Sequence, residues 1–271
     1  MPPRPPRLVA TDLDGTLLRT DRTVSPYTHA VLAAVEAAGA EVVFVTGRPP
    51  RWMDGMAEHA GEHGLAVCSN GALVVDLRHE EILTAHPMAP DLLAHLVDVI
   101  DRAVPKVAFA AEYGWDFAAQ ADYRAVEPHE QVDLATLTSR PAAKLLAKHP
   151  DGDSDALLAR LTDTVGTLAT CTHSGFGSGL VEISAYGVTK ASAVAALCAE
   201  RGIDAADVVA FGDMPNDLEM LRWAGRSYAM RNAHPDVLDV VTARAPTNDD
   251  DGVARTLAAL FDLAEPSHSL R

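Results

Sequence analysis

Short apolar runs alternate with amphipathic stretches along the first part of the chain. Each run is too short for a buried helix and is typical of a buried strand. The runs are Leu8–Ala10, Val42–Val45 and Leu65–Cys68. Ser25 and Pro26 mark a helix start and Gly39 its end, and a further helix is predicted over 51–60. Strands that alternate with helices predict an α/β fold with a parallel sheet and crossover helices.

The pattern changes after Asn70 and Gly71. The runs 72–75 and 82–85 predict a hairpin, and two helices with four strands then predict an α+β unit. The helices are predicted over 90–103 and 154–164, and the strands near 107–111, 143–147, 167–172 and 180–184. Helix 190–201 and strand 208–211 return to the first pattern. We therefore expect a core made of residues 1–84 and 188–271, with residues 85–187 inserted as a second domain. The chain crosses between the two near 84–88 and 184–188, and these are the predicted hinges.

Composition and charge narrow the function classes. The chain has 271 residues, of which 48% are hydrophobic, and a formal net charge of −16. Such a charge disfavours binding to nucleic acids and to anionic membranes. No apolar stretch is long enough to span a bilayer, and the basic start has no apolar signal region, so a cytoplasmic protein is expected. The three cysteines have neither metal-type nor redox spacing, which predicts buried reduced thiols.

Two carboxylates directly follow the first predicted strand. Asp12 and Asp14 begin on the same side of that strand, because alternate side chains point to opposite faces. The carboxyl ends of strands in open α/β sheets are where ligands bind. Two like charges that lie close are costly unless a cation or a shared proton relieves them. A structural alternative is an Asp-Gly turn at Gly15 with an extra acidic residue.

Three further polar groups stand at strand ends or helix starts. Thr46-Gly47-Arg48 follows the second strand, Lys190 opens a helix, and Gly212-Asp213-Met214-Pro215-Asn216-Asp217 follows the strand at 208–211. The acidic residues of the last group also suit a helix N-terminus, which is their structural alternative. Lys190 as an exposed lysine at a helix start is disfavoured by the helix dipole, which favours a functional role.

This ordered set of four motifs resembles the haloacid dehalogenase superfamily, and more closely its Cof-type sugar-phosphatase branch with a type IIB (C2) cap. The resemblance runs from Leu8 to about Leu263. Secondary stretches that share it are Ser69-Asn70-Gly71-Ala72, Met230-Arg231-Asn232-Ala233 and Asn248-Asp249-Asp250-Asp251-Gly252-Val253. The resemblance implies a Rossmann-like parallel-sheet core with an inserted α+β cap, and a mobile flap over 15–24 beside the site.

The resemblance also implies roles for the motif residues. Asp12 is the expected nucleophile, and Asp14 the expected general acid and then general base. Asp12, Asp213 and the backbone carbonyl of Asp14 are the expected Mg²⁺ ligands. Asp217 is expected to hold a metal-bound water or the backbone next to these ligands. Thr46 and Lys190 complete the expected catalytic set. Gly15, Gly47 and Asn216 are the expected phosphate-binding residues, Asn216 alternatively supporting Asp213.

The cap is expected to determine specificity, since the core residues face only the phosphate. Its inward-pointing candidates are Glu112, Trp115, Lys144, His173 and Glu182, for each of which an ordinary structural role is equally open. Arg48 either reaches the substrate or fixes its loop by an ion pair. The segment between Gly114 and Ala143 contains many polar residues, such as Asp122-Tyr123-Arg124 and Glu127-Pro128-His129-Glu130, and is left open as either a substrate-facing loop or an exposed connection.

The predicted function is Mg²⁺-dependent hydrolysis of small phosphate monoesters, with sugar phosphates favoured, through an aspartyl-phosphate. The expected partner is a small phosphorylated molecule, with no nucleic acid and no membrane, and the chain is expected to be a monomer or a weak homodimer. One alternative is a phosphomutase resembling phosphomannomutase, whose cap needs arginines for a second phosphate. This cap offers Arg102, Arg124, Arg140 and Arg160. Another alternative is a non-catalytic sugar-phosphate sensor, which loss of a core carboxylate would favour, and none is missing.

Overall fold

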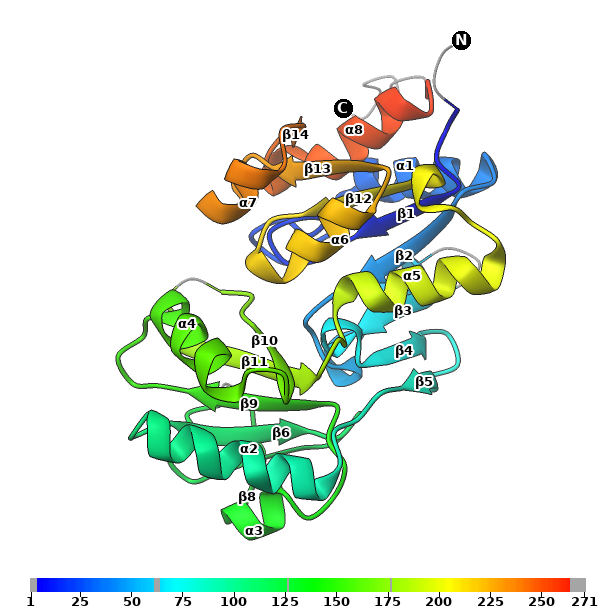
Figure 1. The fold of residues 1–271 in the computed structure, drawn as a ribbon. Coiled ribbons are helices and arrows are strands. Elements are labelled where there is room, and N and C mark those ends of the chain that lie inside the picture. The colour runs from blue at the N-terminus through cyan, green and yellow to red at the C-terminus, as the bar shows by residue number, and fades with distance from the viewer. Residues whose placement is uncertain (1–3, 61–63, 126, 176, 264–271) are drawn as a thin grey trace.

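A computed structural model describes residues 4–60, 64–125, 127–175 and 177–263. It has two sheets, each with helices packed on it (Figure 1). The predicted α/β fold class is confirmed, with a parallel-sheet core and a second α+β unit between its two chain segments. Among the described residues, no helix is both long and apolar enough to cross a membrane.

The larger sheet has eight strands in the order β14-β13-β12-β1-β2-β3-β4-β5. Its parallel strands are β1 (Leu8–Thr11), β2 (Glu41–Val45), β3 (Leu65–Cys68), β12 (Val208–Gly212), β13 (Arg226–Met230) and β14 (Arg244–Ala245). The predicted hairpin is present as β4 (Leu73–Asp76) and β5 (Glu81–Ala85), which extend the sheet antiparallel. The central strands are apolar and fully buried, as expected for strands covered on both faces.

Helices cover both faces of this sheet. Helix α1 (Pro26–Ala37) packs beside α8 (Gly252–Leu260), and α5 (Lys190–Arg201) packs beside α6 (Leu218–Trp223) on the opposite face (Figure 1). The short helix α7 (Pro235–Val240) lies between β13 and β14 in the sequence. The Ser25 side chain accepts from the backbone N–H of Thr28, so α1 begins at the predicted N-cap with Pro26 in its first turn.

The smaller sheet has six strands in the order β10-β11-β9-β6-β7-β8 and is mostly antiparallel. Its strands are β6 (Ala108–Glu112), β7 (Phe117–Ala119), β8 (Glu130–Gln131), β9 (Lys144–Lys148), β10 (Ala169–Thr172) and β11 (Leu180–Ala185). Helices α2 (Pro90–Ala103) and α4 (Ser154–Val165) pack against each other and share an apolar cluster with one face of this sheet. The short helix α3 (Leu134–Leu137) lies near α2. The predicted helices and strands of this unit are confirmed; β7, β8 and α3 fall in the segment that the sequence left unassigned.

The predicted helix over 51–60 is wrong. The segment forms two separate 3₁₀ turns, Pro50–Trp52 and Met56–Glu58. Gly55 between them has φ +76°, a left-handed conformation that ends any regular right-handed helix. Residues 61–63 lie outside the described residues. The consequence for the site is that Arg51 and Trp52 project from a turn beside β2 rather than from a helix face.

The segment 15–24, predicted to be a flap beside the site, is attached to the core in this structure. Leu17 and Leu18 are buried in the core cluster. Arg19 forms a bidentate ion pair with Asp251, with N···O distances of 2.7 and 3.0 Å. The contacts fix the segment next to the strand end that carries Asp12.

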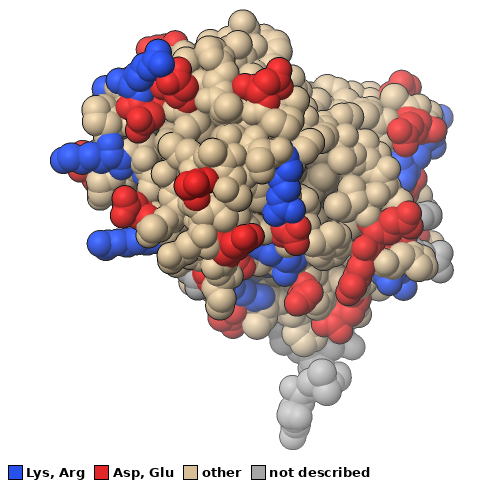
Figure 2. Space-filling model, turned by 90° about the horizontal axis from the view of Figure 1, so that it is seen from below, with Lys and Arg blue, Asp and Glu red and all other residues tan. Residues whose placement is uncertain are grey.

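Acidic and basic side chains are interspersed over the face of the molecule seen in Figure 2, and the described residues drawn there form no broad basic surface.

Candidate active site

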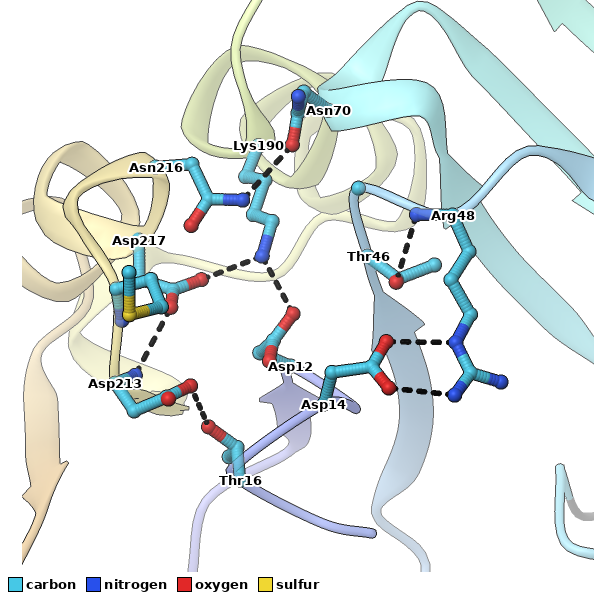
Figure 3. Close-up of polar contacts among 12 residues, drawn as sticks. Asp12, Asp14, Thr16, Thr46, Arg48, Asn70, Lys190, Asp213, Asn216 and Asp217 are labelled. Atoms are coloured by element: carbon cyan, nitrogen blue, oxygen red, sulfur yellow. Dashed lines mark hydrogen bonds and ion pairs between the residues drawn. The ribbon is translucent and has the colours of Figure 1, made fainter. Parts of the chain in front are cut away.

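The strand order brings the predicted motif residues to one edge of the larger sheet. β1 pairs in parallel with both β2 and β12, so the residues after their carboxyl ends are neighbours. Asp12, Thr46 and Asp213 each follow one of these three strands. Figure 3 shows them gathered around the amino group of Lys190 and the loop of Asp14. The sequence motifs therefore form one site.

Lys190 is the buried cation of this site. Its Nζ donates to Asp12 Oδ1 at 2.6 Å and to Asp217 Oδ1 at 2.7 Å (Figure 3). Its side chain is fully buried, so a role as an exposed helix-start lysine is wrong. Burial alone lowers the pKa of a lysine, but the two carboxylates outweigh it and raise the pKa of Lys190 above its usual value. Lys190 is thus a fixed positive charge beside Asp12.

Asp217 organises the loop that carries Asp213. Its Oδ2 accepts from the backbone N–H groups of Asp213 and Met214, both at 3.0 Å. Its other oxygen holds Lys190. Asp217 is completely buried and sits where a helical turn begins, so the helix-start interpretation and the functional one both apply. Its observed contacts are those of a positioning residue behind Asp213.

Three buried carboxylates create a strong local excess of negative charge. One oxygen from each of Asp12, Asp213 and Asp217 lies within 4.8 Å of the other two. Burial, with the nearby negative charges of the other aspartates, raises the pKa of Asp12 well above its usual range despite Lys190. Burial and the charge of Asp217 raise the pKa of Asp213 to about 7. An all-oxygen cluster of this charge fits Mg²⁺, which prefers carboxylate oxygens and water.

Gly15 and Thr16 hold the Asp213 carboxylate close to the first motif. Thr16 Oγ1 donates to Asp213 Oδ1 at 2.7 Å. A Cβ at Gly15 would lie 2.3 Å from Asp213 Oδ2, and Gly15 has φ +77°, so only glycine fits there. The predicted importance of Gly15 thus has a packing cause, and its role toward phosphate stays a prediction.

Asp14 points away from the buried cluster and is held by Arg48. Arg48 Nε donates to Asp14 Oδ2 at 2.7 Å, and Nη2 donates to Oδ1 at 2.6 Å (Figure 3). Half of the Asp14 side chain is exposed, in contrast to Asp12. The sequence left Arg48 with two possible roles, a substrate contact or an ion pair that fixes its loop. In the structure Arg48 forms an ion pair with Asp14. Thr46 Oγ1 accepts from the Arg48 backbone N–H at 3.0 Å, which shapes the turn.

A cavity of about 330 Å³ lies between this edge and the smaller sheet. Asp12, Asp14, Thr46, Gly47 and Asn216 line it from the larger sheet. From the smaller sheet come alternate residues of β9, since Lys144, Leu146 and Lys148 face the cavity while Leu145 and Ala147 lie in the apolar cluster. The cavity is therefore lined by motif residues of the larger sheet on one side and by residues of the smaller sheet on the other.

A buried ionic network joins the two sheets inside this cavity. Lys144 Nζ donates to Glu182 Oε1 at 2.9 Å and to the Gly47 carbonyl at 2.6 Å, and lies 3.3 Å from Glu112. Glu182 also accepts from Asn70 Nδ2 at 3.0 Å. The Lys144 charge thus connects β9 and β11 to the loop after β2, and Asn70 connects β11 to the core.

Asn216 takes part in this connection rather than in supporting Asp213. Its Nδ2 donates to Asn70 Oδ1 at 3.0 Å (Figure 3), and its Oδ1 has no hydrogen-bond partner among the described residues. It lines the cavity, which keeps its predicted phosphate contact open. Asn70 itself has φ +58°, a conformation that asparagine adopts more readily than most residues.

Of the five cap candidates, three face the cavity and two do not. Glu112, Lys144 and Glu182 line it. The inward orientation predicted for Trp115 is wrong, because the residue is 38% exposed in the turn between β6 and β7. His173 is buried but faces Asp155 instead of the cavity.

A second group at the cavity comes from a 3₁₀ turn, from β7 and from the loop after it, and sequence reasoning missed its members Arg51, Trp52 and Phe117. Trp52 Nε1 donates to Glu127 Oε2 at 2.6 Å, and Arg51 donates to Glu127 Oε1 at 2.7 Å. Phe117 and Tyr123 also line the cavity. Tyr123 and Glu127 belong to the polar segment left open as a substrate-facing loop, and they do line the cavity, whereas Arg51 lies 76 positions before Glu127 and shares no motif with it.

A family model for haloacid dehalogenase-like hydrolases matches residues 9–257 of the chain. The chain belongs to this family. Among curated relatives, it is 27% identical over 266 residues to a 5-amino-6-(5-phospho-D-ribitylamino)uracil phosphatase of Bacillus subtilis, covering 95% of this chain and 98% of the relative. It is 29% identical over 239 residues to an HMP-PP phosphatase of Cronobacter sakazakii, covering 86% of each.

A solved structure has the same fold. The protein SMU.1108c of Streptococcus mutans matches with a TM-score of 0.81 at 22% identity, covering 94% of this chain and 99% of that one. The resemblance to the haloacid dehalogenase superfamily, which four short motifs suggested, is confirmed by the family model over residues 9–257.

Proposed function

We propose that this hydrolase is a Mg²⁺-dependent phosphatase that hydrolyses small phosphate monoesters through an aspartyl-phosphate on Asp12. The observation that carries the proposal is the buried cluster of Asp12, Asp213 and Asp217, in which Lys190 pairs with Asp12 and Asp217, and Asp12 also lines a cavity of about 330 Å³. The curated relatives named as phosphatases support the same reaction class. A small phosphorylated molecule is the partner of that cavity.

Mg²⁺ would be held by Asp12, Asp213 and the backbone carbonyl of Asp14, with Asp217 behind Asp213. When bound, Mg²⁺ neutralises charge between the phosphate and the nucleophilic carboxylate. Lys190 supplies a second, permanent positive charge next to Asp12. Together these charges let a carboxylate approach a phosphate dianion, which is the main electrostatic obstacle to the reaction.

The reaction proceeds in two steps. In the first, an Asp12 carboxylate oxygen forms a bond to phosphorus while the bond to the ester oxygen breaks, and Asp14 donates a proton to that leaving oxygen. In the second, Asp14 takes a proton from a water molecule that attacks phosphorus, which releases inorganic phosphate and restores the Asp12 carboxylate. Thr46, Gly47, Gly15 and Asn216 are the proposed contacts for the phosphate oxygens.

Residues 85–187 are the proposed cap, and residues 1–84 and 188–271 the proposed core. The cap lines the cavity opposite the phosphate site with Glu112, Lys144 and Glu182, and we assign the choice of substrate to that wall. Carboxylates and an ammonium group suit the hydroxyl groups of a sugar, which favours sugar phosphates. The proposed compartment is the cytoplasm.

The cap contacts weigh against a phosphomutase. Such an enzyme needs free cap cations for a second phosphate, and of the four cap arginines only Arg124 lines the cavity. Arg102 pairs with Asp98 and Arg140 with Asp116. A non-catalytic sensor is disfavoured because no motif carboxylate is missing: Asp12, Asp213 and Asp217 form the cluster, and Asp14 lines the cavity beside it.

The test is phosphate release from a panel of phosphorylated metabolites that includes sugar phosphates, a uracil-linked ribityl phosphate and a diphosphate. Each is assayed with Mg²⁺ and with EDTA, and Asp12→Asn is the matched inactive control. Mg²⁺-dependent release that Asp12→Asn abolishes supports the phosphatase. Conversion of a sugar phosphate to its isomer without release would favour the mutase, and binding without any turnover would favour the sensor.

A further inference from the structure

Two cations of the proposed cap line the cavity without a carboxylate partner. Lys148 ends β9, and Arg124 lies in the loop between β7 and β8. Among the residues that the structure describes, neither side chain forms an ion pair with Asp or Glu. Lys148 Nζ donates to the Arg124 backbone carbonyl at 3.1 Å and lies 5.7 Å from the centre of the Tyr123 ring. Ammonium and guanidinium groups carry several donors each, so both side chains have donors left for a ligand.

The carboxylates that line the cavity are already paired with other cations. The pairs are Asp12 with Lys190, Asp14 with Arg48, Glu127 with Arg51, and Glu112 and Glu182 with Lys144. None of these acids therefore needs Lys148 or Arg124 for charge compensation. The two cations leave an excess of positive charge at one part of the lining.

The overall charge of the chain makes this local excess informative. The formal net charge is −16, and the lysines are Lys106, Lys144, Lys148 and Lys190. Lys190 and Lys144 are buried in ion pairs, Lys148 lines the cavity, and Lys106 is exposed outside it. A lysine and an arginine that face one cavity of such an acidic protein, with no acid beside them, favour an anionic ligand.

Strand β9 separates this charge from the phosphate site. Lys144 begins the strand, and its Nζ donates to the carbonyl of Gly47, beside the motif residue Thr46. Lys148 ends the same strand, and four positions along a strand span about 13–14 Å. Leu146 lines the cavity between the two lysines. An anionic group near Lys148 therefore belongs to the far end of a molecule whose phosphate lies at the motif residues, and not to an atom next to that phosphate.

We propose that Lys148 and Arg124 form a second anion subsite, and that the substrate carries a carboxylate or a second phosphate at the end of its carbon chain opposite the phosphate that is hydrolysed. Both side chains donate charge-assisted hydrogen bonds to carboxylate and to phosphate oxygens, so the subsite suits either group. The inference rests on the proposed phosphatase function and narrows its substrates to sugar phosphates with an anionic group at each end. The group at this subsite is held there, while the bond that breaks is the one at Asp12.

The test compares two matched pairs of ligands. Sorbitol 6-phosphate and 6-phosphogluconate differ by a carboxylate at carbon 1, and fructose 6-phosphate and fructose 1,6-bisphosphate differ by a phosphate at carbon 1. The wild type is expected to favour the doubly charged member of at least one pair by about tenfold to a hundredfold in kcat/KM, the effect of a hydrogen bond to a charged group. A preference within the first pair identifies a carboxylate, and a preference within the second identifies a phosphate.

Three variants assign the preference to the subsite. Lys148→Met and Arg124→Met keep an apolar stem and remove the charge, so each should lower the preference, and the double variant should bring it to about one. Arg124 is exposed, so its replacement carries little risk to folding, and thermal unfolding checks every variant. Lys106→Met removes an exposed lysine of the proposed cap that does not line the cavity, and it should keep the wild-type preference.

Binding measurements separate this inference from the proposed function. Calorimetry with the same four ligands in the Asp12→Asn background gives dissociation constants without turnover. If the wild type hydrolyses p-nitrophenyl phosphate but neither pair shows a preference in kcat/KM or in binding, the subsite is wrong and the phosphatase stands. If no ester is hydrolysed, but a doubly charged ligand binds more tightly and loses that advantage in the double variant, the subsite is supported and the phosphatase is not. A preference that survives in the double variant, or that Lys106→Met also removes, overturns the proposal.

Discussion

Arg48 donates two parallel hydrogen bonds, of 2.6 and 2.7 Å, to the two carboxylate oxygens of Asp14, and both residues line the same cavity as Asp12. Such a bidentate pair fixes both the position and the orientation of a carboxylate. The two aspartates of the first motif thus have opposite environments. Asp12 is buried against Lys190, while Asp14 is half-exposed against an arginine. Asp12 thus lies beside a fixed cation, whereas Arg48 positions Asp14 at the cavity and must release one of its oxygens before Asp14 can carry a proton.

Replacing Arg48 should impair proton transfer from Asp14 to the leaving oxygen more than it impairs the attack of Asp12 on phosphorus. Arg48→Ala leaves Asp14 without its partner, and we expect kcat/KM for alkyl phosphates to fall roughly tenfold to a hundredfold, part of what general acid catalysis supplies. p-Nitrophenyl phosphate needs little protonation of its leaving group, so its loss should be smaller. Steady-state kinetics on both esters gives the comparison. Arg22→Ala, at an exposed site, is the control.

Equal losses on both esters would show that Arg48 acts on substrate binding or loop structure instead. Asp14→Asn sharpens the test, because it keeps the size of the side chain but removes the proton carrier. The double variant should then be little worse than Asp14→Asn alone, since Arg48 acts through Asp14.

Replacing Asp12 should abolish turnover without unfolding the protein. Asp12→Asn is nearly isosteric and removes the nucleophile, so kcat should fall by roughly 10⁴-fold or more. Lys190 retains Asp217 as an ion-pair partner at 2.7 Å, which keeps its charge compensated. Phosphate release and thermal unfolding measure the two effects. Asp98→Asn, on an exposed part of α2, is the matched control. Activity near the wild-type level would remove Asp12 from the mechanism.

The motif residues after β1, β2 and β12 could be predicted from the sequence, because each of these motifs follows a buried apolar strand. The runs that end before Asp12, Thr46 and Asp213 are central parallel strands, and the chemistry at their ends is fixed by strand order. The cap wall was only partly predictable. Alternation in β9 and β11 pointed Lys144 and Glu182 inward, whereas Trp115 lies in a turn where no periodicity fixes direction. Contacts such as Trp52 to Glu127 depend on how the two units meet, which local sequence does not encode.

Removing the Lys144 charge should destabilise the protein and alter its selectivity. Lys144→Met leaves Glu182 buried without its cation and Glu112 with only Arg51, at 3.6 Å, a loss of about 3–5 kcal/mol for a broken buried pair. The variant that also carries Glu112→Gln and Glu182→Gln should recover much of that loss. Denaturant unfolding measures both. If Glu112, Lys144 and Glu182 select the substrate, the more stable triple variant should change the kcat/KM values of individual sugar phosphates more than the kcat/KM of p-nitrophenyl phosphate. An unchanged profile would leave the network a structural role.

Metal removal should make stability depend on pH through Asp213. Burial and the charge of Asp217 raise the pKa of Asp213 to about 7 in the folded protein, against an ordinary value of 3.8. Between these values the folded protein holds a proton that the unfolded chain has lost. In EDTA, stability should therefore fall as pH rises from about 4 to about 7, and Asp12, whose pKa is also raised by burial, adds to the loss in the same direction.

Mg²⁺ should reverse this trend, because it competes with the proton for the same carboxylate oxygens. The increase in melting temperature on adding Mg²⁺ should be small near pH 5 and grow as pH rises through about 7, with protons released on binding. Thermal scans at several pH values, with EDTA or Mg²⁺, measure the effect. Asp213→Asn carries no charge, so its EDTA curve should be flatter and its response to Mg²⁺ weak, whereas the exposed Asp98→Asn should behave as the wild type. A Mg²⁺ response that is constant with pH, or retained in Asp213→Asn, would place the ion elsewhere.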